Sequence, residues 1–175
     1  MTTNERTADV LIVGGGVIGC AIARRAARDG LSVVVLERGT PGMEASWAAA
    51  GMLSPLAEAD GPGPFLDLLV AAREIYPMYA ATLREETGVD VSYSDAGTLY
   101  AALREEDEQA LEARWRWQSA AGLPLERLSA DQARDAEPAL APSVRGALRF
   151  PGDHQVDNRA LSAALWSAAA RAGAA

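Results

Sequence analysis

Three glycines near the start of the chain have the spacing of a loop that binds a dinucleotide. Gly14, Gly16 and Gly19 fit the pattern G-x-G-x-x-G. In this pattern the first glycine permits a tight turn, the second lets a pyrophosphate approach the backbone, and the third lets a helix pack closely on a strand. The predicted chemistry is phosphate binding by backbone N–H groups and by the positive end of a helix dipole.

An acidic residue, Glu37, follows the glycines at close to the spacing of about 20 residues that this fingerprint requires. Its carboxylate can accept hydrogen bonds from both ribose hydroxyls of an adenosine, and its charge would repel a 2′-phosphate. The sequence therefore predicts FAD or NAD as the ligand rather than NADP. Replacement of Glu37 by alanine is expected to weaken adenosine binding and to leave the fold intact.

Two strands and a helix would position these residues. Asp9 to Val13 is a continuous apolar run, typical of a parallel strand that is covered on both faces. Val17 to Asp29 reads as a helix of small and apolar residues, and Gly30 ends it. Leu31 to Leu36 reads as a second buried strand, so the chain is predicted to open as a β-α-β unit.

The segment after Glu37 favours FAD over NAD, which the fingerprint alone does not separate. Arg38 to Pro64 is predicted to be a long loop with one short helix, and loops of this length inside a compact domain are uncommon unless they bind something. Within it, Glu44 to Leu53 is rich in small residues whose backbone could lie flat against a large planar ring. A hinge or linker is the alternative interpretation.

The rest of the chain is predicted to alternate between helices and strands. Pro77 is expected to break one helix near Tyr76, because an interior proline costs a helix about 3 kcal/mol. Ser129 has the spacing of a capping box, and Asp157 can cap the last helix. The predicted elements are helices over 65–87, 105–121 and 158–172, a short helix after 129, and strands over 89–93, 97–102 and 146–150.

The last predicted helix indicates that the sequence is truncated. In a doubly wound fold such a helix returns to a strand of the central sheet, and no strand follows Gly173.

Composition disfavours several classes of function. A formal charge of −8 and a pI near 4.7 argue against a nucleic-acid partner. With one cysteine, Cys20, and one histidine, His154, neither an internal disulfide nor a metal site is expected. No apolar run has the length of a membrane span, and residues 1–6 lack the layout of a signal peptide. The expected location is the cytoplasm.

Six sequence motifs, which extend over nearly the whole chain, together resemble the D-amino-acid oxidase superfamily of flavoenzymes. They are most similar to the glycine oxidases of thiamine biosynthesis. The motifs are V-L-I-V-G-G-G-V-I-G at 10–19, V-L-E-R-G at 35–39, A-A-A-G-M-L at 48–53, E-E-T-G-V-D at 85–90, G-T-L-Y at 97–100 and G-A-L-R-F-P-G-D-H-Q-V-D at 146–157.

This resemblance implies an α/β fold with a Rossmann-like FAD-binding domain and the first part of an inserted α+β substrate domain. The implied boundaries are 9–61 for the first part of the FAD-binding domain, 62–151 for the first part of the substrate domain, and 152–175 for a helix that returns to the FAD-binding domain.

The resemblance also implies which residues contact FAD. Two departures from the family pattern are Ala45, where relatives often have a hydroxyl residue, and the bulky Trp47. No histidine that could attach the flavin covalently lies near this loop in sequence, and the arginine that would grip a substrate carboxylate falls beyond Ala175, so no catalytic residue is assigned. The implied contacts are Gly14, Gly16, Val17, Ile18 and Gly19 at the phosphates, Glu37 and Arg38 at the adenosine, Ala45 and Ser46 beside the phosphates or ribityl chain, and Ala50, Gly51 and Met52 at the flavin ring.

The activity implied is that of an oxidoreductase that converts the amine of glycine or a small amino acid to an imine. In such enzymes a hydride passes to the flavin, and oxygen reoxidises it with release of hydrogen peroxide. The partners implied are the amino-acid substrate and oxygen, and a homo-oligomeric full-length form is left open. The alternatives are a D-amino-acid dehydrogenase, a sarcosine oxidase, or an inactive nucleotide-binding remnant.

Overall fold

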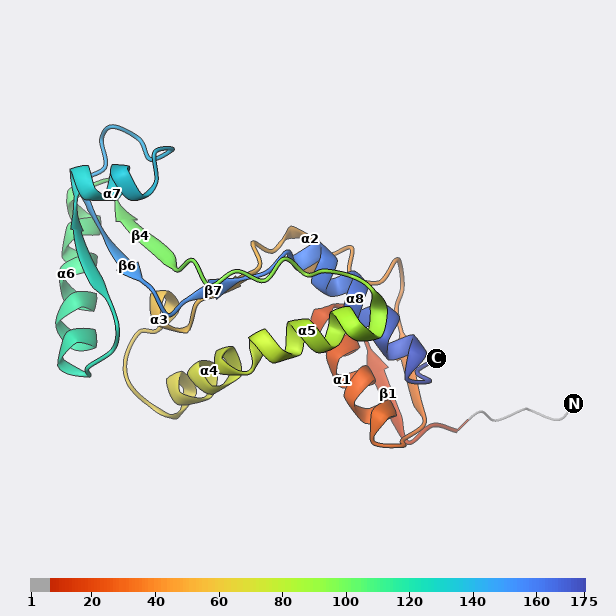
Figure 1. The fold of residues 1–175 in the computed structure, drawn as a ribbon. Helices are drawn as coiled ribbons and strands as arrows, with labels where there is room; N and C mark the ends of the chain where they lie inside the picture. Colours follow the sequence, from red (N-terminus) through yellow and green to blue (C-terminus); the bar gives the residue numbers. More distant parts are fainter. Residues whose placement is uncertain (1–6) are drawn as a thin grey trace, which may run out of the picture. The chain divides into compact units, whose positions relative to one another are not determined.

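The computed structural model describes residues 7–175 (Figure 1), so the lead-in inspected for a signal peptide lies outside the described residues. The chain divides into two compact units, each built from segments that are separated in sequence. Unit 1 contains the described residues up to Gly51 together with Pro77–Tyr93 and Val156–Ala175, and unit 2 contains Met52–Tyr76 and Ser94–Gln155.

Unit 1 opens with the predicted β-α-β arrangement. Strands β1 (Val10–Val13) and β2 (Val33–Leu36) pair in parallel, with helix α1 (Val17–Arg28) between them in sequence. Gly30 follows the end of α1 with φ of 87°, a conformation that glycine adopts without strain. The terminal Ala175 pairs with the other edge of β2, because its N–H donates to Val33 O at 3.0 Å and its carbonyl accepts from Val35 N at 2.7 Å.

Helix α8 (Asn158–Arg171) packs beside α1 on one face of this sheet. Each helix contributes an alanine, Ala23 or Ala169, to the buried cluster against the sheet. The predicted N-cap is confirmed, since Asp157 Oδ1 accepts hydrogen bonds from Arg159 N and Ala160 N, both at 2.9 Å. The core of this face consists of Ile12, Ala23, Val33 and Ala169.

The prediction that the first strands are covered on both faces is wrong for the residues that the structure describes. Ile12 points into the core, whereas Leu11 and Val13, on the opposite face of the strand, are 61% and 83% exposed. The reason is that α1 and α8 contribute their buried residues to the same cluster, which lies on one face of the sheet.

The predicted helix break near Pro77 is confirmed. Helix α4 (Pro64–Glu74) ends at Ile75, and helix α5 (Tyr76–Thr87) begins directly afterwards. The break lets α4 belong to unit 2 and nearly all of α5 to unit 1.

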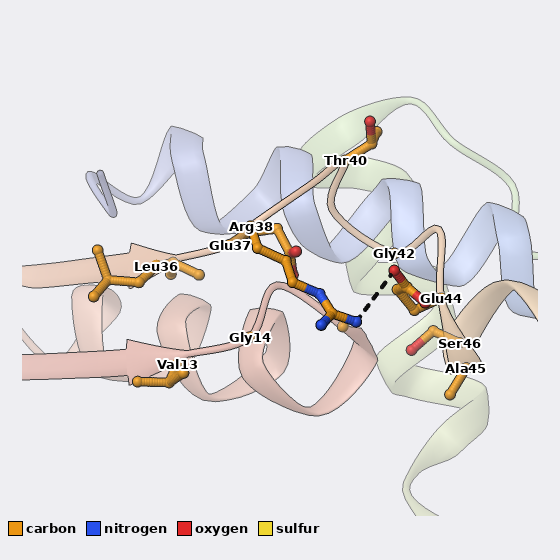
Figure 2. A pocket seen from close by; sticks show the side chains of 12 residues that line it. Val13, Gly14, Leu36, Glu37, Arg38, Thr40, Gly42, Glu44, Ala45 and Ser46 are labelled. Carbon is orange, nitrogen blue, oxygen red and sulfur yellow. Dashed lines mark ion pairs between the residues drawn. The ribbon is translucent and has the colours of Figure 1, made fainter.

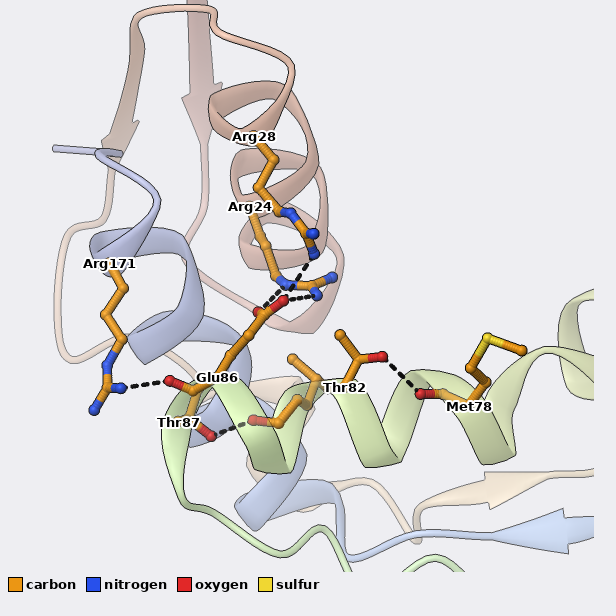
Figure 3. A network of polar contacts seen from close by, with 8 residues as sticks. Arg24, Arg28, Met78, Thr82, Glu86, Thr87 and Arg171 are labelled. Atoms are coloured by element: carbon orange, nitrogen blue, oxygen red, sulfur yellow. Dashed lines mark hydrogen bonds and ion pairs between the residues drawn. The ribbon is translucent and has the colours of Figure 1, made fainter.

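An ion cluster joins α5 to α1 and α8 within unit 1 (Figure 3). The Glu86 carboxylate accepts two hydrogen bonds of 2.7 Å from Arg24 and one of 2.7 Å from Arg28, and its backbone carbonyl accepts one from Arg171. The Arg24 side chain is buried, and its guanidinium lies 5.3 Å from the centre of the Tyr79 ring. These contacts lower the pKa of Glu86, chiefly through the hydrogen bonds from Arg24.

The prediction of a strand over 89–93 is wrong. Ser92 has a positive φ of 50°, and its N–H donates to Asp90 Oδ1 at 2.8 Å, which closes a local turn in place of a strand. Ser94, just beyond this segment, forms an isolated bridge with Gln155.

Unit 2 is built on a three-stranded antiparallel sheet of order β4-β6-β5. The predicted capping box is confirmed at Ser129, whose hydroxyl accepts from Gln132 N while the Gln132 side chain accepts from Ser129 N. Strand β5 was not predicted, because its sequence E-R-L-S is polar and mostly exposed. The elements are β4 (Thr98–Ala102), α6 (Glu105–Ala120), β5 (Glu126–Ser129), α7 (Ala130–Ala136) and β6 (Gly146–Phe150).

Several polar side chains of unit 2 are buried and bonded to the backbone. Asp153 is fully buried, and its carboxylate accepts from Leu56 N at 3.0 Å and Ala57 N at 2.8 Å. Gln118, also fully buried, donates to Leu56 O at 2.7 Å. Burial raises the pKa of Asp153 despite the two backbone hydrogen bonds. The surrounding core contains Leu56, Leu66, Leu111, Leu148 and Phe150.

The segment predicted as a long loop with one short helix is more ordered than expected. It contains helices α2 (Ala45–Ala48) and α3 (Pro55–Glu58) and strand β3 (Met52–Leu53), which pairs antiparallel with β7 (His154–Gln155). The division into units also differs from the predicted domain boundaries, since residues 52–61 fall in unit 2 and 77–93 in unit 1.

Candidate functional site

Each of the three fingerprint glycines occupies a position that disfavours a side chain. Gly14 turns the chain out of β1 with φ of 104°, and a Cβ on Gly19 would lie 2.0 Å from Gly14 O. A Cβ on Gly16 would lie 3.0 Å from Ser46 Oγ. Gly16 is also the N-cap of α1 and offers no side chain to the first N–H groups of the helix. The reason is a positive φ at Gly14, a close backbone contact at Gly19 and the Ser46 side chain at Gly16.

A cavity of about 760 Å³ opens at the carboxyl ends of β1 and β2 (Figure 2). In open parallel sheets, ligands bind at this end of the strands. Six of the predicted contact residues line it, and these are Gly14, Gly16, Glu37, Arg38, Ala45 and Ser46. The other lining residues are Val13, Val35, Leu36, Thr40, Gly42 and Glu44.

Ser46 links the two walls of the cavity. Its hydroxyl accepts a hydrogen bond of 3.0 Å from Val17 N, the first N–H group of α1. Ser46 thus supplies the cap that Gly16 lacks, from a segment 29 residues away. At the preceding position, Ala45 has no hydroxyl to offer, in keeping with the departure noted in the sequence.

Glu37 organises the fingerprint loop with its carboxylate. Oε2 accepts from Gly15 N at 2.8 Å, and Oε1 accepts from Gly39 N at 2.9 Å. These two hydrogen bonds favour the charged form and lower the pKa of Glu37. The acid therefore holds the loop in addition to the ribose role predicted for it, because each carboxylate oxygen can accept more than one hydrogen bond.

The edge of the cavity carries an exposed pair of opposite charges. Arg38 Nη2 lies 3.5 Å from Glu44 Oε1, and both side chains are largely exposed (Figure 2). Exposed ion pairs of this kind contribute little to stability. Arg38 could therefore leave Glu44 and bind an anionic ligand at little cost in stability.

The predicted flavin contacts at residues 50–52 lie outside the residues that line this cavity. Gly51 has φ of 75°, and a Cβ there would lie 2.0 Å from Val156 O. Its carbonyl accepts from Val156 N at 2.9 Å, so this backbone is fixed in unit 1. Met52 begins β3 in unit 2 and is 46% exposed. Val17, Ile18 and Gly19 in α1 also do not line the cavity.

Sequence reasoning missed two kinds of site residue. Val13 and Leu36 could have been found from the rule that ligands bind at the carboxyl ends of parallel strands. Asn158, whose side chain bonds to the backbone of residues 46 and 47, has no comparable signal, because its partners are more than 100 residues away.

Cys20 lies beneath the fingerprint loop but is not poised for chemistry. Its thiol is buried and donates to Gly15 O at 3.2 Å, and burial raises its pKa. A neutral thiol is a poor nucleophile, so Cys20 has a packing role.

Two other kinds of feature are absent from the part of the chain that the structure describes. Over residues 7–175, no group of three His, Cys, Asp or Glu side chains is arranged to hold a metal ion. Within the same described range, no helix has both the length and the apolar character needed to cross a membrane.

Comparison with known proteins identifies the family. The family described as DAO, FAD dependent oxidoreductase, matches residues 9–175. The chain belongs to this family. The predictions of the family, of an FAD cofactor and of an α/β flavoprotein fold are thereby confirmed.

Individual relatives point in the same direction. The chain is 41% identical to glycine oxidase of Geobacillus kaustophilus over 167 aligned residues. The aligned region is 95% of this chain and 44% of that relative. It is 37% identical to a bifunctional protein ThiO/ThiG of Synechocystis sp., over 97% of this chain and 24% of that protein.

Solved structures agree with these relatives. The crystal structure of glycine oxidase from Geobacillus kaustophilus superposes with a TM-score of 0.90 at 40% identity, over 96% of this chain and 45% of that one. An L-α-glycerophosphate oxidase from Mycoplasma pneumoniae with FAD bound superposes with a TM-score of 0.78 at 25% identity, over 97% of this chain and 44% of that one. The chain therefore spans less than half the length of these relatives.

Proposed function

We propose that the protein carrying this chain is an FAD-dependent oxidase that converts the amine of glycine or a small amino acid to an imine. The observation that carries the proposal is the cavity at the carboxyl ends of β1 and β2, with the glycine loop on one side and Glu37 on the other. The similarity to glycine oxidase over 95% of the chain supports the substrate class.

The residues at the cavity fit the adenosine and pyrophosphate of FAD. The glycine loop leaves the N-terminus of α1 uncovered by side chains of its own, which suits an anion. Glu37 would accept from the ribose while it continues to hold Gly15, and Arg38 would lie beside the same group. FAD, when bound, supplies the two-electron oxidation of the amine.

The remaining predicted contacts, most of them outside the cavity, complete the proposed cofactor site. We assign Val17, Ile18 and Gly19 to the phosphates because they form the first turn of α1. Ala45 and Ser46 would lie beside the phosphates or ribityl chain, and Ala50, Gly51 and Met52 at the flavin ring. The fixed backbone at Gly51 supports this last assignment, because a rigid segment without side-chain bulk can lie against a planar group.

The finer parts of the proposal concern the reaction partners and the setting. We propose that oxygen is the electron acceptor and hydrogen peroxide a product, and that the imine feeds the thiazole branch of thiamine synthesis. The names of the relatives, glycine oxidase and ThiO/ThiG, support this setting. A cytoplasmic location, a homo-oligomeric form and the substrate-domain role of residues 62–151 belong to the same proposal.

Expression of the complete reading frame that contains this chain tests the proposal. A purified protein with a visible flavin spectrum and glycine-dependent peroxide release is expected. Sarcosine and D-alanine would be assayed alongside glycine to fix the substrate, and a dye acceptor without oxygen would reveal a dehydrogenase. A protein that binds no flavin would overturn the proposal.

A variant of Glu37 tests the cofactor site itself. Glu37→Ala is expected to weaken FAD binding about tenfold or more, because it removes an acceptor for the ribose and loosens the loop at Gly15 and Gly39. Glu85→Ala, which removes an exposed acid of α5 in the same unit, is the matched control and is expected to bind FAD normally. Equal affinities of the two variants would contradict the assignment.

A further inference from the structure

The first turn of α8 holds the segment that carries Ser46. Asn158 is the first residue of this helix, and its side-chain Nδ2 donates to Ser46 O at 2.6 Å and to Trp47 O at 2.9 Å. Two donors on one short amide therefore fix two successive peptide carbonyls of α2. Asn158 itself does not line the cavity.

Neighbouring contacts make this arrangement a rigid one. The Arg159 guanidinium lies 4.3 Å from the centre of the Trp47 ring. On the other side of Asn158, Val156 N donates to Gly51 O, and the close approach of Val156 O to Gly51 leaves no room for a Cβ. The segment from Ser46 to Gly51 is thus held at both ends by residues 156–159.

Asn158 is the residue that connects this support to the cavity. It fixes the peptide of Ser46, and the Ser46 hydroxyl accepts from Val17 N at 3.0 Å at the start of α1. A shift of the Ser46 backbone would move the hydroxyl away from the helix N-terminus. Aspartate at position 158 could not replace asparagine, because its oxygens would face two carbonyl oxygens.

We propose that Asn158 is a positioning residue for FAD, and that it acts by holding Ser46 at the N-terminus of α1. The inference rests on the proposed cofactor site. It goes beyond that site because it assigns a role in cofactor affinity to Asn158 of α8, which does not itself line the cavity.

A double-mutant cycle tests whether Asn158 acts through Ser46. Asn158→Ser, Ser46→Ala and the double variant would be made in the complete reading frame, and the Kd for FAD would be measured by flavin fluorescence. Each single variant is expected to weaken FAD binding about tenfold, from the loss of hydrogen bonds. The double variant is expected to be little weaker than Ser46→Ala, because no hydroxyl remains to be positioned.

A matched control separates positioning from support of the helix. Asp157→Ala removes the N-cap of α8 but keeps both hydrogen bonds of Asn158, so it is expected to lower thermal stability and leave the Kd for FAD unchanged. If Asp157→Ala and Asn158→Ser weaken FAD equally, Asn158 is only a structural residue. If the effects of Asn158→Ser and Ser46→Ala simply multiply, the path through Ser46 is wrong.

FAD binding by the unsubstituted protein separates a failure of the Asn158 role from a failure of the proposed function. An unsubstituted protein that binds FAD, together with an Asn158→Ser variant of equal affinity, would overturn the inference and leave the proposed function standing. An unsubstituted protein that does not bind FAD would overturn both. Asn158→Asp provides a second variant, and is expected to weaken FAD binding at least as much as Asn158→Ser.

Discussion

The two units use their polar groups in opposite ways. In unit 1 the polar groups of the glycine loop, Glu37 and Ser46 surround an open cavity and bond to backbone groups at its edge. In unit 2, Asp153 and Gln118 are fully buried and bond to the backbone around Leu56. The first arrangement leaves donors and acceptors that can be shared with a ligand, whereas the second uses them to complete a core.

This difference predicts which substitutions should affect FAD binding and which should affect only the stability of the fold. Changes at the cavity of unit 1 should alter FAD affinity, and changes at the buried polar groups of unit 2 should alter stability without altering FAD affinity. Four predictions test this division, in order of decreasing effect.

Gly19→Ala should be the most damaging change. Its Cβ would lie 2.0 Å from Gly14 O, a backbone atom that can yield only if α1 moves away from β1. We expect a loss of about 4 kcal/mol or more in the free energy of unfolding and no measurable FAD binding. Gly61→Ala, where a Cβ meets nothing within 4 Å, is the control. Urea unfolding would measure the stability of both variants and flavin absorbance their FAD content. Normal FAD binding by Gly19→Ala would contradict the role assigned to the glycine loop.

Asp153→Ala should destabilise unit 2 and spare the cofactor. It leaves Leu56 N and Ala57 N buried without an acceptor, which should lower the free energy of unfolding by about 3 kcal/mol. Hydrogen exchange of the two amides should rise, while the Kd for FAD stays within twofold of the original. A large loss of FAD affinity with unchanged stability would contradict the structural role assigned to Asp153.

Glu86→Gln should weaken unit 1 by about 2 kcal/mol, since it removes the charge that Arg24 and Arg28 share. Because the folded-state pKa of Glu86 lies below its ordinary value of 4.5, the stabilisation is present above that pH. It is lost as the pH falls through the lowered pKa. The stability difference between the original protein and the variant should therefore shrink below about pH 4.5, as measured by thermal unfolding at several pH values.

Arg25→Gln should have the smallest effect. The pair formed by Arg25 and Asp29, 2.8 Å apart on the surface of α1, is exposed on both sides. Exposed pairs four residues apart on a helix contribute little, so we expect the Tm to change by no more than about 1 °C. A change in Tm as large as that of Glu86→Gln would show that the exposed pair Arg25–Asp29 stabilises the protein as much as the cluster around Glu86.

The features that the sequence predicted depend on neighbours in the chain. The β-α-β opening follows from glycines and apolar runs within 30 residues, and the helix break follows from Pro77 alone. The caps at Ser129 and Asp157 are likewise local, since each side chain bonds to N–H groups two or three residues ahead. Such features can be predicted without knowledge of the rest of the fold.

The features that were missed depend on distant partners. Strands β3 and β7 are two residues long and exist only because they pair with each other across about half of the chain. The exposed face at Leu11 and Val13 depends on where two helices pack, which an apolar run does not reveal. The cavity could be predicted in part, through Gly14, Gly16, Glu37, Arg38, Ala45 and Ser46, because these residues belong to recognisable motifs.

The link between Asn158 and Ser46 also imposes an order in time. The two residues are 112 positions apart, with all of unit 2 encoded between them. At a translation rate of about 5–20 residues per second, Ser46 leaves the ribosome about 5–20 s before Asn158. During this interval the segment after β2 lacks the helix that supports it, although the glycine loop has already been made. The hydrogen bonds that fix Ser46 to α8 can therefore form only after all of unit 2 has been synthesised.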